Sequence, residues 1–388
     1  MEIFEGYRIK LYPTEMQRKR LFELLDTSRY CYNWGIEQEK LIYSETGRFT
    51  RNYDLYKLLS KHRQIPENEW LLNTPLSIQR LTLDKVVMAY ERFFNKQCRY
   101  PRFKTRKSIK KSFPIRSERI YFNGNSVSFE GMGHNNRILC KDHKVPKGPN
   151  VKYCNSTISF DGDDFWICLS VKLEQVIEFE PQGEALGIDL GIRKLATLSN
   201  GKTYISPDTS KLERRLRRID KRVSKDMHKR LKLSMSTRTK YENIPKSKNQ
   251  LKREKSRRST IRRIVNINNS FINNMTKEIV MMNPSYIVLE DLRVREMQQK
   301  YTFTRAEISK ARFRTIRTQL EKKCNTYGIK VYIADSQFPS SQICSNCGNR
   351  HFIDRARIYR CPKCGMTMDR DLNAAINLRN YPLAQGAV

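Results

Sequence analysis

Four cysteines near the C-terminus have the spacing of a metal-binding site. They form two Cys-x-x-Cys pairs, Cys344 with Cys347 and Cys361 with Cys364, and 13 residues separate the pairs. Four thiolates arranged in this way bind Zn²⁺ tetrahedrally, and a site closed by four protein ligands is structural rather than catalytic. We therefore predict one structural zinc ion. A second, irregular group lacks another Cys-x-x-Cys pair and predicts zinc far more weakly: Cys140, His143, Cys154 and His134.

Three carboxylates occupy positions that suit metal-dependent catalysis. Asp189 lies within an apolar stretch, Glu290 closes another, and Asp371 follows the last cysteine by seven residues, at the start of a predicted helix. A carboxylate buried in an apolar strand is costly unless it binds a cation or a partner. If the three converge, divalent cations relieve their repulsion, and two Mg²⁺ ions about 4 Å apart are a standard device for phosphodiester hydrolysis.

Neighbouring acids compete for these roles. Asp291 adjoins Glu290, and either Asp291 or Asp369 can be a solvent-facing charge or a cap. Asp369 is well placed to cap the final helix. Asp335 ends a further predicted strand. Residue types and spacing alone leave these alternatives open.

The charge of the chain indicates a polyanionic partner. Its 75 Lys and Arg against 40 Asp and Glu give a formal net charge of +35. Residues 211–263 concentrate 22 of the basic residues against 5 acidic ones, which is typical of a nucleic-acid footprint. The basic segment 99–111 also carries two aromatic residues and suits a nucleic-acid backbone with unstacked bases, although a solvated linker remains an alternative.

The strands and helices that carry the acids are predicted to form a mixed α/β domain. Apolar runs predict strands at 185–189, 286–290 and 330–335, and Asn200-Gly201 predicts a hairpin after the first of them. A helix is expected at 313–327 because its apolar residues recur at helical spacing. Strand ends and a helix N-terminus can meet at one edge of such a sheet, which would bring the three acids together.

The N-terminal part reads as a smaller β-structure with inserted helices. Residues 6–12 alternate as a strand, Thr14 and Gln17 form a predicted capping box, and a second helix is expected from Thr74-Pro75, with Pro75 at its first position. Hairpins are expected at 120–128 and 156–173, so several short strands predict a small barrel. The acidic segment 174–184 reads as a linker to the next domain.

The chain resembles the transposon-encoded TnpB family, relatives of the RNA-guided effectors of type V CRISPR systems. The resemblance is carried most specifically by Gly187-Ile-Asp-Leu-Gly-Ile-Arg-Lys-Leu-Ala-Thr, Ile287-Val-Leu-Glu-Asp-Leu, Ser340-Ser-Gln-Ile-Cys-Ser-Asn-Cys-Gly and Asp369-Arg-Asp-Leu-Asn-Ala-Ala-Ile-Asn-Leu. It extends to Tyr7-Arg-Ile-Lys-Leu-Tyr-Pro-Thr, Tyr30-Cys-Tyr-Asn-Trp34 and Pro101-Arg-Phe-Lys104. It therefore covers nearly the whole chain.

This resemblance implies a multi-domain α/β architecture. Residues 1–13 with 98–180 would form a barrel-like wedge domain, and 14–97 an inserted helical recognition domain. Residues 185–388 would form an RNase H-like (RuvC) nuclease domain, with a zinc-binding insertion at 340–368. The family's catalytic acids fall on Asp189, Glu290 and Asp371, which would bind two catalytic Mg²⁺ ions.

The function implied is RNA-guided, Mg²⁺-dependent cleavage of double-stranded DNA next to a transposon-adjacent motif. The guide would be an RNA derived from the transposon end. A guide-directed repressor or a transposition regulator that binds without cutting is the alternative, since some relatives have lost nuclease acids. No apolar run is long enough to cross a membrane, so we expect a cytoplasmic prokaryotic protein that associates with the nucleoid when bound to DNA.

Overall fold

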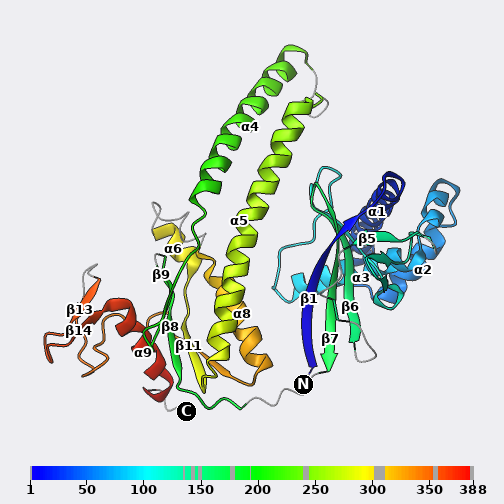
Figure 1. The fold of residues 1–388 in the computed structure, drawn as a ribbon. Helices are drawn as coiled ribbons and strands as arrows, with labels where there is room; N and C mark the ends of the chain where they lie inside the picture. The colour runs from blue at the N-terminus through cyan, green and yellow to red at the C-terminus, as the bar shows by residue number, and fades with distance from the viewer. Residues whose placement is uncertain are drawn as a thin grey trace. The chain divides into compact units, whose positions relative to one another are not determined.

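The computed structural model describes residues 2–133, 136–140, 145–146, 151–174, 180–192, 194–238, 244–300, 311–352 and 357–384. The chain divides into two compact units, unit 1 (Met1–Val176) and unit 2 (Ile177–Val388). The boundary falls within the acidic segment 174–184 that the sequence predicts as a linker. The two units are drawn in Figure 1 and are described separately below.

Unit 1 contains a seven-stranded antiparallel sheet. Its strands are β1 (Glu2–Tyr12), β2 (Lys111–Pro114), β3 (Tyr121–Asn123), β4 (Ser126–Ser128), β5 (Ile138–Cys140), β6 (Val151–Phe160) and β7 (Phe165–Glu174). Their order in the sheet is β2-β6-β7-β1-β5-β4-β3. The two predicted hairpins are present as β3–β4 and β6–β7. Strand β1 pairs along most of its length with β7, so the first strand of the chain lies beside the last strand of unit 1.

The helices of unit 1 lie between β1 and β2 in the sequence. They are α1 (Glu15–Thr46), α2 (Asn52–His62) and α3 (Leu76–Phe94), with a 3₁₀ turn at Pro66–Asn73. A second 3₁₀ turn, Ser117–Arg119, follows β2. The capping box at the start of α1 is confirmed, because Thr14 and Gln17 exchange side-chain to backbone hydrogen bonds. Pro75 is the residue before α3 rather than its first helical residue.

Helix α1 joins the core of the unit 1 sheet. Leu21, Leu24 and Leu25 are buried in one apolar cluster with Ile9 of β1 and Ile167 of β7. In the second half of α1, Gly35 lets the helix approach Leu83 and Val86 of α3. Helix α1 therefore shares one apolar cluster with the strands and packs on α3 further along its length.

Unit 2 contains a five-stranded mixed sheet. Its strands are β8 (Leu186–Asp189), β9 (Lys194–Leu198), β10 (Thr203–Ile205), β11 (Tyr286–Glu290) and β12 (Lys330–Ala334), in the order β10-β9-β8-β11-β12. The first three strands pair antiparallel, and β8, β11 and β12 run parallel. The predicted hairpin at Asn200-Gly201 is confirmed, and Gly201 has a φ of +87° there.

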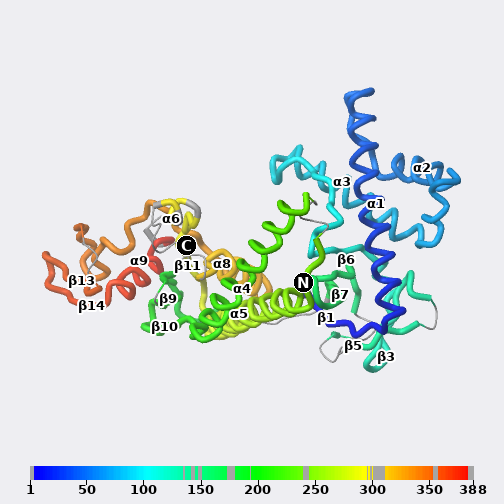
Figure 2. The backbone as a smooth tube through the Cα atoms, turned by 90° about the horizontal axis from the view of Figure 1, so that it is seen from above, coloured from blue at the N-terminus to red at the C-terminus, as the bar shows by residue number. Residues whose placement is uncertain are grey.

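Helices cover both faces of this sheet. Helices α5 (Lys248–Met281) and α8 (Phe313–Thr326) pack with Ile188, Ile287 and Leu289 on one face. Helix α9 (Arg370–Ala384) packs with Tyr286 and Val288 on the other, through Leu378. Figure 1 shows α9 and α8 on opposite sides of β8 and β11, and Figure 2 shows them on opposite sides of β11. Successive strand residues point to opposite faces, so the face on which a strand residue packs also fixes the face toward which the next acidic side chain points.

The described residues of the basic region 211–263 lie mainly in two long antiparallel helices. Helix α4 (Ser210–Ser236) lies beside the first half of α5, and the pair extends beyond the sheet of unit 2 (Figure 1). We call α4 and residues 248–263 of α5 the helical arm. None of the helices among the described residues is both long enough and apolar enough to cross a membrane. The remaining short elements are α6 (Val294–Lys300), β13 (Ile358–Arg360) and β14 (Thr367–Asp369).

Candidate active site and metal centre

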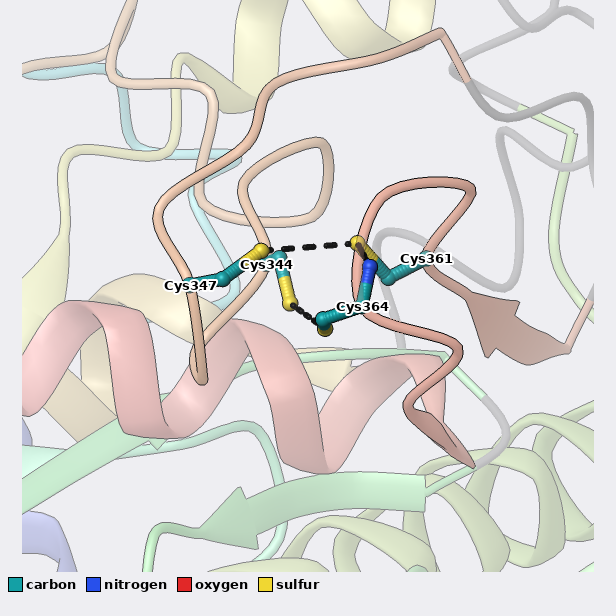
Figure 3. Close-up of side chains that lie close together, drawn as sticks. All are labelled: Cys344, Cys347, Cys361 and Cys364. Atoms are coloured by element: carbon teal, nitrogen blue, oxygen red, sulfur yellow. Dashed lines mark hydrogen bonds between the residues drawn. The ribbon is translucent and has the colours of Figure 1, made fainter.

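The four cysteines predicted to bind zinc come together. Their Sγ atoms all lie within 4.8 Å of one another, and Figure 3 shows the four side chains converging from two loops. The Sγ atoms of Cys344 and Cys364 are 3.6 Å apart, as are those of Cys347 and Cys361. A tetrahedral ion with Zn–S distances of about 2.3 Å requires sulfur atoms about 3.8 Å apart. The donor set and its spacing therefore fit a structural Zn²⁺ ion.

The zinc module is built on local turns and a small core of its own. Gly348 and Gly365 follow the two Cys-x-x-Cys pairs with φ values of +72° and +74°, conformations that favour glycine. Strands β13 and β14 pair antiparallel between the cysteine loops and α9. Tyr359 of β13 is fully buried, and its hydroxyl lies 3.2 Å from Nδ1 of His351. His351 therefore supports the module through Tyr359, outside the group of four thiols.

Two buried asparagines of α9 fasten the zinc module to the helix that carries Asp371. The amide of Asn377 donates to the carbonyl oxygens of Ser340 and Ile343 at 2.8 and 2.7 Å. Asn373 donates to Ile343 at 2.7 Å, and its oxygen accepts from the backbone N–H of Ser345 at 3.0 Å. The sequence analysis assigned these asparagines no role. Their spacing of four residues within a helix was the only available signal, because it places both on one helical face.

The three predicted catalytic acids arrive from three different elements on one face of the unit 2 sheet. Asp189 ends β8 and Glu290 ends β11, and these strands are parallel neighbours with Ile188 opposite Leu289. Ile188 and Leu289 point toward α5 and α8. The alternation of side chains therefore directs Asp189 and Glu290 toward the opposite face, which α9 covers.

Helix α9 comes unusually close to this face because of Gly187. A Cβ atom at Gly187 would lie 1.9 Å from the carbonyl oxygen of Ala375 and 2.4 Å from the backbone nitrogen of Arg379. Only glycine allows this approach. Asp371 lies one helical turn before Ala375, so the same approach brings Asp371 toward the end of β8 that carries Asp189.

The negative charges of the other two acids act on Asp189. The pKa of Asp189 is raised to about 7, first by removal from water and then by the negative charges of Asp371 and Glu290. The pKa of Glu290 is also raised, by burial. Among the described residues, the cysteines are the only group of three or more metal-ligating side chains whose donor atoms all lie within 4.8 Å. The three carboxylates are therefore neighbours that are spread more widely than the ligands of a single compact site.

Asp369 caps the N-terminus of α9, as its position before the helix suggests. Its Oδ1 accepts hydrogen bonds from the backbone N–H groups of Asp371 and Leu372, which caps α9. Its Oδ2 accepts from the ammonium of Lys194 at 2.7 Å. Burial acts to raise the pKa of Asp369, but Lys194 and the backbone donors outweigh it, and the pKa is lowered. Lys194 was assigned no role from the sequence; it holds the cap of the helix that presents Asp371.

The other competing acids face elsewhere. Asp291 forms an ion pair with Arg317 of α8, with 2.7 Å between Oδ1 and Nη1. Asp335 is exposed, and its carboxylate accepts from the backbone N–H of Gln337 at 2.7 Å in a turn. Neither contributes to the raised pKa of Asp189. The weaker zinc alternative lies partly outside the described residues, since His134 and His143 are among those left out.

Acidic side chains of the helical arm form ion pairs between its two helices, and most of its basic side chains face solvent. Arg253 of α5 donates to both carboxylate oxygens of Asp226 of α4, at 2.7 and 2.6 Å, and Arg257 donates to Asp220 at 2.6 Å. Glu254 pairs with Lys246 at 2.7 Å. Helix α4 has no fully buried residue. The arm is thus a hairpin held by ion pairs whose surplus positive charge faces solvent, as a nucleic-acid footprint requires.

Three family models match separate parts of the chain. The model described as a helix-turn-helix domain matches residues 1–48, the model described as a probable transposase matches 168–300, and the Cas12f1-like TNB domain matches 313–378. The last of these contains both the zinc module and Asp371.

Similar proteins align along the whole chain. A protein of Streptomyces pristinaespiralis named "Putative RNA-guided DNA endonuclease" is 27% identical over 393 residues, covering 100% of this chain and 91% of its own length. TnpB-like protein L770 of Acanthamoeba polyphaga mimivirus is 24% identical, covering 96% of this chain and 72% of its own length. The fold is similar to that of the protein in a Cas12f1–sgRNA–target DNA complex, with a TM-score of 0.52, 12% identity and coverage of 98% and 99% of the two chains. The order of the matched domains, the cysteine module and the full-length relatives agree: this chain is similar to TnpB-like proteins along its whole length.

Proposed function

We propose that this chain is an RNA-guided DNA endonuclease whose catalytic Mg²⁺ ions are held by Asp189, Glu290 and Asp371. The observation that carries the proposal is the convergence of these acids, from β8, β11 and α9, on the face of the sheet that α9 covers. Carboxylate oxygens are the donors that Mg²⁺ prefers. Negative charges this close raise the pKa of Asp189, and bound cations would remove that cost.

Two ions are proposed because phosphodiester hydrolysis at such carboxylates uses a pair of metal ions. In such a site, two Mg²⁺ ions activate the attacking water and stabilise the leaving oxygen of a phosphodiester. The protein's own residues supply the framework: the strand ends hold Asp189 and Glu290, and the N-terminus of α9 presents Asp371. Asp369 and Lys194 keep that N-terminus in place through the cap and its ion pair.

We further propose that residues 185–388 form an RuvC-like nuclease domain with a zinc-binding insertion at 340–368. The strand order of unit 2, with three antiparallel strands followed by two parallel ones, supports an RNase H-like assignment. In unit 1, the strands would be the wedge domain (1–13 and 98–180) and the inserted helices the recognition domain (14–97). The zinc ion would be structural, because four thiolates leave no open position for a substrate.

Guide RNA and target DNA are the proposed partners. Three observations support them: the net charge of +35, the exposed cations of the helical arm, and the relative that is named an RNA-guided DNA endonuclease. Pairing with the guide would select the target, while the protein would contact backbones and a short duplex motif.

The test is cleavage of a plasmid that matches the RNA that copurifies with the protein. We expect cutting with Mg²⁺, no cutting with EDTA, and a loss of at least a thousandfold in rate for Asp189→Ala, since the variant removes a metal ligand. Asp335→Ala is the matched control, because Asp335 ends the neighbouring strand but is exposed outside the acid cluster. Equal cutting by Asp189→Ala would refute the catalytic assignment. Guide-dependent DNA binding without any cutting by the wild type would instead support the non-cleaving alternative.

A further inference from the structure

A cationic pocket lies within unit 1, far along the sequence from the acids of unit 2. It is a cavity of about 330 Å³ between α1, α3 and β2, and we call it the cationic pocket. Its lining includes Tyr32, Thr82, Lys85, Arg92, Lys104 and Ser112. No aspartate or glutamate is among its lining residues. With about 30 Å³ for each water molecule, the cavity has room for a small anionic group together with its hydration.

Lys104 is held at this pocket by its neighbours. The side chain of Asn33 accepts from the backbone N–H of Lys104 at 2.7 Å and donates to its carbonyl oxygen at 3.0 Å. The Lys104 ammonium lies 3.9 Å from the centre of the Tyr32 ring. Just before it in the chain, Tyr100 packs edge-on against Tyr90 and Phe93. The first part of the basic segment 99–111 therefore contacts the helices through Tyr100 and Lys104, while residues 102–110 stay exposed to solvent.

The pocket concentrates positive charge without a protein counter-ion. Within the described residues, Lys85, Arg92 and Lys104 have no carboxylate within 4.0 Å. Asp84 stands next to Lys85 in the sequence, but its carboxylate accepts hydrogen bonds from Asn52 and Tyr56. The pKa of Lys104 is lowered, first by removal from water and then by the charge of Lys85. Lys85 and Lys104 both line the pocket without a carboxylate partner among the described residues, which favours an anion as its occupant.

We propose that the cationic pocket binds a backbone phosphate of a nucleic acid, with Lys104 and Lys85 as its ligands and Asn33 as the residue that positions Lys104. Ammonium groups bind phosphate as compact point charges, and hydroxyl groups such as those of Thr82 and Ser112 at the pocket wall suit phosphate oxygens. This site deepens the proposed function by naming where unit 1 contacts a nucleic-acid backbone. It does not require that the chain cut DNA.

The experiment measures binding of the full-length protein in EDTA, so that cleavage plays no part. The variants are Lys104→Gln, Lys85→Gln and Asn33→Ala, and the matched control is Lys61→Gln, an exposed lysine of α2 outside the pocket. The probes are the copurifying RNA, a duplex DNA that matches it, and random-sequence RNA and duplex DNA of the same lengths. Each dissociation constant is measured over a range of salt concentrations.

We expect Lys104→Gln and Lys85→Gln to weaken binding of one class of probe about tenfold or more. The slope of log affinity against log salt should fall by about 0.7 for a single-stranded or 0.9 for a duplex contact. Asn33→Ala should reproduce the effect of Lys104→Gln, and Lys104→Arg should restore most of the affinity. Loss confined to RNA assigns the phosphate to the guide, and loss of DNA binding with normal RNA loading assigns it to the target.

Affinities and salt slopes within twofold of the wild type for all three variants would overturn the proposal. So would a loss of thermal stability without any change in binding, because the lysines would then be structural. The random-sequence probes separate this test from that of the proposed function. If the wild type fails to cut a matched plasmid but Lys104→Gln still weakens binding of random probes, the pocket assignment stands and the endonuclease assignment fails.

Discussion

Replacing Asp189 with asparagine is expected to stabilise unit 2 at alkaline pH when Mg²⁺ is absent. Asp189 ends β8 beside Asp371 and Glu290, and its pKa is raised from 3.8 to about 7. In the folded protein the carboxyl group keeps its proton up to about pH 7, whereas in the unfolded chain it releases it near pH 3.8. The folded state therefore binds more protons between these values, and the free energy of unfolding falls as pH rises through this range.

The size of the effect follows from the same shift. A difference of about three pH units, at about 1.4 kcal/mol for each, sets an upper limit of about 4 kcal/mol. Asp189 is partly exposed and water screens it, so we expect a stabilisation of about 1–3 kcal/mol for Asp189→Asn at pH 8. Below about pH 4 the two proteins should be equally stable, because the wild-type carboxyl group is then neutral in both states.

Hydrogen exchange of peptides that cover β8 and β11 is the appropriate assay. The three tryptophans, Trp34, Trp70 and Trp166, all lie in unit 1, so fluorescence would report on the other unit. Wild type and variant are compared at each pH, which cancels the intrinsic pH dependence of exchange. Adding Mg²⁺ should stabilise the wild type more than the variant and so reduce the difference.

Two outcomes would refute this reasoning. One is a difference in protection between Asp189→Asn and the wild type that does not change between pH 4 and pH 8. The other is an equal, pH-dependent gain for Asp335→Asn, because Asp335 is exposed at the end of β12 and does not face the acid cluster. Either result would show that Asp189 is not held among neighbouring negative charges.

Three further predictions concern the framework of the site. Gly187→Ala should lower the free energy of unfolding by at least about 4 kcal/mol and abolish cleavage, because the new Cβ atom would lie 1.9 Å from the backbone of α9. Gly6→Ala is the control and should be tolerated, because no atom lies within 4 Å of its Cβ position. Hydrogen exchange of α9 distinguishes the two variants. Cys361→Ser should lower the bound zinc from about one ion per chain toward zero, measured by metal analysis, and reduce the protection of α9 from hydrogen exchange. Cys98→Ser changes an exposed cysteine and should leave the zinc content unchanged. Asn377→Ala leaves the carbonyl of Ser340 without its side-chain donor and removes one of the two donors to the carbonyl of Ile343. It should destabilise the joint between the zinc module and α9 by about 1–3 kcal/mol, seen as faster zinc release to a chelator, and an unchanged release rate would contradict the role of this asparagine.

The sequence by itself determined the features that depend on short-range spacing. The two Cys-x-x-Cys pairs identify the metal centre, because each pair sets its own two thiolates. The capping box at Thr14, the hairpin at Asn200-Gly201 and the strand ending at Glu290 depend on hydrogen bonds and alternation within a few residues. Such signals are visible without knowing which distant segments meet.

Only the tertiary structure decided which of several acids lie on the same face of the sheet and which residues hold them there. Strand alternation directs Glu290 toward α9 and leaves Asp335 outside, and the N–H groups of α9 make Asp369 a cap. The contact between Asn33 and Lys104 likewise joins two motifs 71 residues apart, and it is visible only once the chain is folded. The physical reason is that strand order, helix docking and charge repulsion are properties of residues far apart in the chain, which local patterns do not encode.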